Sequence, residues 1–125
     1  MRTVVFIIAV CLTLSASMSF GADFKATLKR VNRGDAEAQF ELARMYAQGD
    51  GVKQDYTKAR EYLEKAAALN HVGAISNLGE MYFNGYGVKQ DYTKARELFE
   101  KAAALNYAGA SYNLGYMYFT RRPPL

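Results

Sequence analysis

Cysteine and histidine are almost absent from this chain: its 125 residues contain one of each, Cys11 and His71. A single cysteine cannot close a disulfide within the chain, so no disulfide framework holds the fold. One cysteine and one histidine also fall short of the three or four ligands that a zinc site of the usual kind requires. We therefore expect no metal and no cofactor, and a fold stabilised by packing of apolar residues.

The residues for nucleophilic catalysis are equally scarce. Beyond residue 21 the chain has two serines, Ser76 and Ser111, and no base is apparent beside either. Nucleophilic catalysis by serine needs an oriented general base. The single histidine, His71, is best explained as a residue at a helix start or on the surface. The glycine triplets at 49–51 and 85–87 lack the Lys-Thr pair of a phosphate-binding loop and are interpreted as turns. We predict that the protein is not an enzyme.

A strong excess of one charge is also missing. The chain has sixteen lysines and arginines and twelve acidic residues, which gives a formal net charge of +4. The two signs alternate within the sequence, for example in Arg60, Glu61, Glu64 and Lys65. This alternation is typical of a solvated helical face, not of a polybasic strip. We therefore expect no nucleic-acid partner.

The first 21 residues differ in character from the rest. Arg2 precedes an apolar run from Val4 to about Leu14, and small and polar residues follow. This is the arrangement of a secretory signal peptide, for which we predict residues 1–21 with cleavage before Ala22. Cleavage after Ser17 or Ser19 and an uncleaved membrane anchor are the alternatives. We expect an exported bacterial protein, periplasmic or secreted, with no stable membrane insertion after cleavage.

An internal repeat dominates the remaining sequence. The stretch GVKQDYTKAR occurs at 51–60 and again at 87–96, and residues 49–70 match residues 85–106 at all but three positions. A period of 36 residues is typical of arrays in which each unit is one supersecondary motif stacked on its neighbours. We divide the domain at 22–125 into units at 35–70 and 71–106 and a partial unit at 107–125.

Each unit reads as two helices. Apolar residues recur at steps of three and four over 35–48, which predicts the first helix. The glycine triplet at 49–51 ends this helix. Asp55 is a suitable N-cap for the second helix, which runs to about residue 69. The third unit stops inside its first helix near Phe119. Residues 23–33 predict a short helix before the first unit. The expected fold is all-α, with about six helices.

The motifs of the second unit resemble the Sel1-like repeat. They are an alanine at 74, LxxMY at 78–82, GxGV at 85–88, QDYxKA at 90–95 and KAA at 101–103. The resemblance implies a right-handed α-solenoid, similar to tetratricopeptide repeats, whose concave face binds a protein or peptide. Some cysteine-rich bacterial relatives bind penicillin, so a penicillin-binding or β-lactamase-like hydrolase is one alternative. A truncated fragment of a longer repeat protein is another.

Comparison of the three copies separates two kinds of position. At four positions the residue is identical in all three copies, and we call these positions held and expect them to pack inside the stack. They are 38/74/110, 42/78/114, 45/81/117 and 46/82/118. Others vary along one side of each first helix. We predict that this varied stripe binds the partner protein or peptide, although its aromatic members could instead be core residues. The predicted binding residues are Phe40, Arg44, Ser76, Glu80, Phe83, Tyr112, Tyr116 and Phe119.

The last predicted helix is unusually aromatic. It carries Tyr112, Tyr116, Tyr118 and Phe119 without a second helix after it. An apolar face of this kind indicates a homodimer contact, a docking site for another molecule, or a product cut short.

Overall fold

The computed structural model describes residues 24–120. Residues 24–32 form the N-terminal helix, and five helices of 13 residues follow. These are α2 (Ala36–Gln48), α3 (Tyr56–Ala68), α4 (Val72–Asn84), α5 (Tyr92–Ala104) and α6 (Ala108–Thr120). The predicted signal peptide lies outside the described residues.

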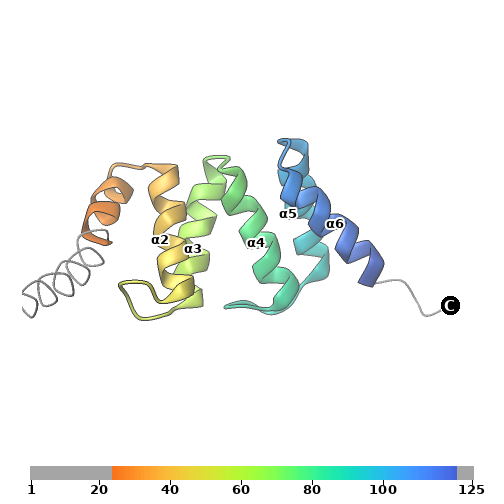
Figure 1. Ribbon diagram of the computed structural model, residues 1–125, viewed down its shortest axis with the longest axis horizontal. Helices are drawn as coiled ribbons and strands as arrows, with labels where there is room; N and C mark the ends of the chain where they lie inside the picture. Colours follow the sequence, from red (N-terminus) through yellow and green to blue (C-terminus); the bar gives the residue numbers. More distant parts are fainter. Residues whose placement is uncertain (1–23, 121–125) are drawn as a thin grey trace, which may run out of the picture.

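The helices form an all-α solenoid, which confirms the fold expected from the sequence. Successive helices run in opposite directions and follow one another along a single row, from the N-terminal helix at one end to α6 at the other (Figure 1). Helices α2 and α3 form the first hairpin, α4 and α5 the second, and α6 the first half of a third.

Residues at the helix ends explain where each helix starts and stops. The carboxylate of Asp55 accepts a hydrogen bond from the backbone N–H of Lys58, and Asp91 does the same for Lys94, so both are N-caps. Gly49 and Gly85 end α2 and α4 with φ of 69° and 74°, a left-handed conformation that favours glycine. The Asp55 cap and the glycine turns are as the sequence predicted.

A repeated hydrogen-bond pattern holds the turn inside each hairpin. The side-chain amide Nε2 of Gln54 donates to the carbonyl of Ala47 at 2.8 Å and to the hydroxyl of Tyr56 at 3.1 Å. Gln90 makes the equivalent contacts in the second unit, to the Phe83 carbonyl and the Tyr92 hydroxyl. The identical GVKQDY segments therefore stabilise the turn, and Tyr56 and Tyr92 both have a structural role in it.

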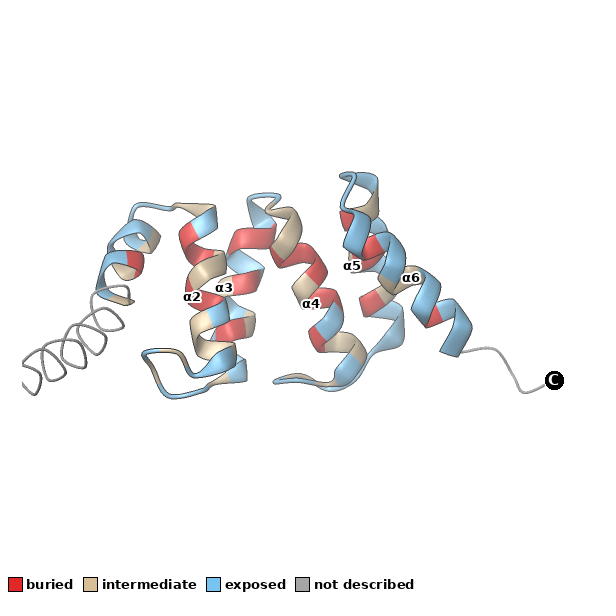
Figure 2. Ribbon diagram, in the orientation of Figure 1, coloured by how far each residue is buried: buried red, intermediate tan, exposed pale blue. Residues whose placement is uncertain are grey.

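Small residues set the spacing between helices. Ala38, Ala74 and Ala110 occupy equivalent positions in α2, α4 and α6, and none of them has measurable exposure. The buried residues line the contacts between neighbouring helices along the row (Figure 2). Because alanine has only a methyl group, the backbones of neighbouring helices can approach closely.

The large side chain of Phe99 packs against a glycine, Gly79. The ring of Phe99 in α5 packs against Gly79 in α4, where a Cβ atom would lie 2.6 Å from the ring atom Cε1. In the first unit the equivalent positions hold Ala43 and Leu63, both buried in one core cluster. The copies thus pair alanine with leucine and glycine with phenylalanine, which keeps the core filled at nearly constant volume.

Tyr118 is an exception to the predicted packing. It occupies a held position, but its exposed fraction is 60%, whereas the equivalent Tyr46 stacks on Tyr62 of α3 with ring centroids 5.9 Å apart. Helix α6 has no such second helix beside it among residues 24–120. The prediction that this position is internal in every copy is therefore wrong for the third unit.

Candidate functional site

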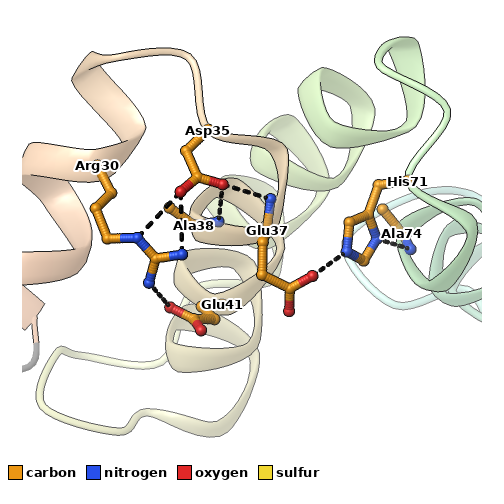
Figure 3. Close-up of polar contacts among 7 residues, drawn as sticks. All are labelled: Arg30, Asp35, Glu37, Ala38, Glu41, His71 and Ala74. Atoms are coloured by element: carbon orange, nitrogen blue, oxygen red, sulfur yellow. Dashed lines mark hydrogen bonds and ion pairs between the residues drawn. The ribbon is translucent and has the colours of Figure 1, made fainter.

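The first helices of the units contact one another directly on one side of the row. His71, the N-cap of α4, places its Nε2 atom 2.7 Å from the Glu37 carboxylate of α2 (Figure 3). Its ring stacks on that of Phe40, with the ring centroids 4.5 Å apart. The backbone N–H of Ala74 donates to Nδ1. Nδ1 therefore carries no proton, and Nε2 is the donor to Glu37. The helix-start role predicted for His71 is confirmed.

A second set of contacts joins α4 to α6. The side-chain amide of Asn113 donates to the Glu80 carboxylate at 3.2 Å, and the ring of Phe83 meets that of Tyr116 edge to face at 5.9 Å. Between these contacts lies an open groove of about 320 Å³. Its lining residues are Glu80, Phe83, Asn84, Phe99, Tyr112, Asn113, Tyr116 and Met117.

Four of the eight predicted binding residues come together in this groove: Glu80, Phe83, Tyr112 and Tyr116. Tyr112 is 75% exposed and Tyr116 51% exposed, so both rings present most of their surface to solvent. Phe83 is half-buried between Tyr92 and Tyr116. Its ring therefore supports the groove wall as well as lining it.

The other four predicted residues lie elsewhere. Phe40 packs on His71, and Phe119 is exposed but does not line the groove. Arg44 lines a separate hollow of about 400 Å³ between α2 and the N-terminal helix. Ser76 is buried, with 1% exposure, so it cannot belong to a contact surface. Its small side chain is covered because α4, unlike α2 and α6, has a first helix in contact on each side.

Glu80 dominates the electrostatics of the groove. It is the only charged residue in the lining, and among the described residues it forms no ion pair. Its one side-chain hydrogen bond comes from Asn113. The groove therefore combines a solvent-accessible carboxylate with the aromatic rings of Phe83, Tyr112 and Tyr116.

Sequence reasoning missed the two asparagines of the groove. Asn113 is equivalent to Glu41 and Asn77, so this position also varies between copies and is one step from the predicted stripe. Including every varied position of the first helices would have found it. Asn84, at the end of α4, donates its side-chain amide to the Glu80 carbonyl.

At the other end of the row, an ion-pair cluster joins the N-terminal helix to α2. Arg30 of the N-terminal helix contacts Asp35 and Glu41, each at 3.0 Å (Figure 3). The pKa of the Asp35 carboxyl is lowered. The larger cause is the hydrogen bond that it accepts from the N–H of Ala38, and the contact with Arg30 adds to the effect. The hydrogen bond to Asp35 in turn raises the pKa of Arg30. The cluster fixes the N-terminal helix against the start of α2.

The described residues contain neither a cluster of metal ligands nor a membrane-spanning helix. Within residues 24–120, no group of three histidine, cysteine or acidic residues is arranged to hold a metal ion. None of the helices in this range has the length and apolar character needed to cross a bilayer.

The family assignment follows from comparison with known repeats. The Sel1 repeat matches residues 36–71, 72–107 and 108–123, and this chain therefore belongs to the Sel1 repeat family. Among curated proteins, none matches the chain.

Solved structures share the fold. The chain is 37% identical, with a TM-score of 0.74, to a protective antigen of uropathogenic Escherichia coli that displays an SLR fold; the match covers 76% of this chain and 20% of the antigen. A Sel1 repeat protein from Oxalobacter formigenes is 38% identical, with a TM-score of 0.69 and coverage of 77% and 72%. For Helicobacter pylori cysteine rich protein B the identity is 31%, the TM-score 0.67 and the coverage 70% and 66%. The chain thus spans about a fifth of the antigen.

Proposed function

We infer that this protein is an exported scaffold that binds a segment of a partner protein in the groove between α4 and α6. Sel1 repeats generally mediate protein–protein interaction, which supports a scaffold role. The observation that carries the proposal is the convergence of Glu80, Phe83, Tyr112 and Tyr116 on one open groove. Tyrosine, together with tryptophan and arginine, is enriched among the residues that contribute most to binding at protein interfaces.

The chemistry of the groove selects a kind of ligand. A lysine or arginine side chain can pair with the Glu80 carboxylate while its stem and charge lie against the rings of Tyr112 and Tyr116. No other charged residue lines the groove to compete for Glu80 or to repel a cation. The partner is therefore a peptide segment with a basic residue next to apolar ones, bound in an extended or helical form.

Selection from a library of displayed random peptides tests this proposal. Peptides enriched on the full chain should carry lysine or arginine beside apolar residues. Combined replacement of Phe83, Tyr112 and Tyr116 by alanine should weaken binding of the selected peptides at least about 30-fold, the effect of losing a single hot spot of about 2 kcal/mol. Helix content should stay unchanged, because two of the three rings are mostly exposed. Peptides that bind this triple variant as tightly as the native chain would refute the proposal.

A matched control separates the groove from the exposed aromatic surface in general. Tyr86 is 50% exposed and stacks on Tyr56 in the turn region, away from the groove lining. Tyr86→Ala removes a similarly exposed ring, so peptide binding should survive this change.

A further inference from the structure

The two asparagines of the groove both turn their side-chain nitrogen toward Glu80. The Nδ2 atom of Asn113 in α6 donates to the Oε1 atom of the Glu80 carboxylate at 3.2 Å. The Nδ2 atom of Asn84 donates to the backbone carbonyl of Glu80 at 2.9 Å. A carboxylate and a carbonyl only accept hydrogen bonds, so Glu80 fixes which end of each amide faces it. The oxygen of each amide is therefore directed away from the Glu80 atom that its nitrogen contacts.

This arrangement leaves hydrogen-bond acceptors for a ligand. Within residues 24–120, no hydrogen bond reaches the Oδ1 atom of Asn84 or of Asn113, and none reaches the second carboxylate oxygen of Glu80. All three residues line the groove. Glu80 and Asn84 are exposed and Asn113 is half-buried. The groove thus offers a negative charge and additional oxygen acceptors from two helices, next to aromatic rings.

The side chain of arginine suits these groups better than that of lysine. A guanidinium carries five N–H donors in a rigid planar fork, so it can donate to acceptors on more than one residue at once. Its flat face also stacks on aromatic rings, and those of Tyr112 and Tyr116 are exposed here. The ammonium of lysine is a compact, strongly hydrated charge with three donors. It can pair with Glu80, but it has no plane to stack and no fork to span separate acceptors.

We propose that the groove selects arginine over lysine, and that Asn84 and Asn113 determine this selectivity. The selectivity rests on the function proposed above, since a basic residue of the partner must first enter the groove. Glu80 attracts either cation. The asparagine oxygens accept the further N–H groups of a guanidinium, and Asn113 also positions the Glu80 carboxylate through its hydrogen bond.

Two matched peptide arrays test the selectivity. Both contain the same set of short peptides with random apolar flanks, and the central residue is arginine in one array and lysine in the other. Each peptide that binds the full 125-residue chain is then titrated in both forms. The Kd of the arginine form should be at least about tenfold lower than that of the lysine form, the effect of roughly one charge-assisted hydrogen bond.

Removal of both asparagines should abolish this difference. In the double variant Asn84→Ala/Asn113→Ala, Glu80 and the rings remain, so the arginine peptides should lose affinity until the two Kd values agree within about threefold. A purely structural role of the asparagines would weaken both kinds of peptide equally and leave the ratio unchanged. The matched control is Asn77→Ala. Asn77 is the equivalent of Asn113 in α4 and is also half-buried, but it does not line the groove, so the native ratio should persist.

Three results would count against this proposal in different ways. Equal Kd values for arginine and lysine peptides on the native chain would overturn the selectivity and leave the proposed function intact. A tenfold difference that persists in the double variant would overturn the role of the two asparagines. Binding of neither array to the native chain would contradict the proposed function itself, and the selectivity with it.

Discussion

The imidazole of His71 joins two units of the stack: its Nε2 lies 2.7 Å from the Glu37 carboxylate of α2, while its Nδ1 caps α4 through the N–H of Ala74. The same ring stacks on Phe40. A single side chain thus starts one helix and attaches it to the preceding unit. No other histidine occurs in the chain, and the equivalent cap of α2 is Asp35.

Substitution of His71 should separate these two roles. His71→Ala removes the cap, the contact with Glu37 and the stacking on Phe40, and should lower the free energy of unfolding by about 1–2 kcal/mol. His71→Asn keeps a capping oxygen and should recover part of that loss. Urea denaturation followed by circular dichroism measures both variants. Equal stability of the alanine variant and the native chain would contradict the role described for His71.

Stability should fall in acid through Asp35. The folded-state pKa of this carboxyl is lowered, so its stabilising effect is complete above the unfolded-state pKa of about 3.9 and is lost as the pH falls through the folded-state value. The protein should therefore unfold at lower urea concentration below about pH 4 than at pH 7. Asp35→Asn keeps the capping oxygen but does not titrate, so its denaturation midpoint should decline less in this range. An identical decline in both proteins would show that Asp35 is not responsible.

The pair formed by Gly79 and Phe99 should show strong energetic coupling. Gly79→Ala places a Cβ atom against the ring and should cost about 1–3 kcal/mol, the usual range for overpacking a core. Phe99→Leu alone should also destabilise, because it leaves a gap. The double variant reproduces the combination of Ala43 and Leu63 and should be more stable than the sum of the single effects predicts. A double-mutant cycle by chemical denaturation measures this coupling, and strictly additive effects would contradict the match.

The repeat in the sequence was sufficient to predict the fold because each hairpin is built by local rules. Glycine turns, aspartate caps and the spacing of alanines can all be recognised in the amino-acid sequence. The helix limits in the structure therefore differ from those expected by about one residue. The binding stripe was harder to place. Whether Ser76 is covered depends on contacts of α4 with both α2 and α6, which no periodicity within one helix reveals. Tyr118 was misplaced because its exposure depends on whether a second helix lies beside α6, and none does among residues 24–120.

Export can be checked independently of binding. The predicted signal peptide at 1–21 should be removed when the full chain is produced in a bacterium with an envelope. Mass spectrometry of the envelope fraction should then find a protein that begins at Ala22. An intact N-terminus starting at Met1 on protein from the cytoplasm would contradict export.

The central claim is that the groove between α4 and α6 binds a basic peptide segment through Glu80. Glu80→Lys reverses its charge at an exposed position, so the fold should be retained. The most direct measurement is a second selection from the same peptide library on this variant. Lysine and arginine should disappear from the enriched sequences, and aspartate and glutamate should replace them, with the apolar residues kept. Enrichment of the same basic peptides on Glu80→Lys and on the native chain would contradict binding through Glu80.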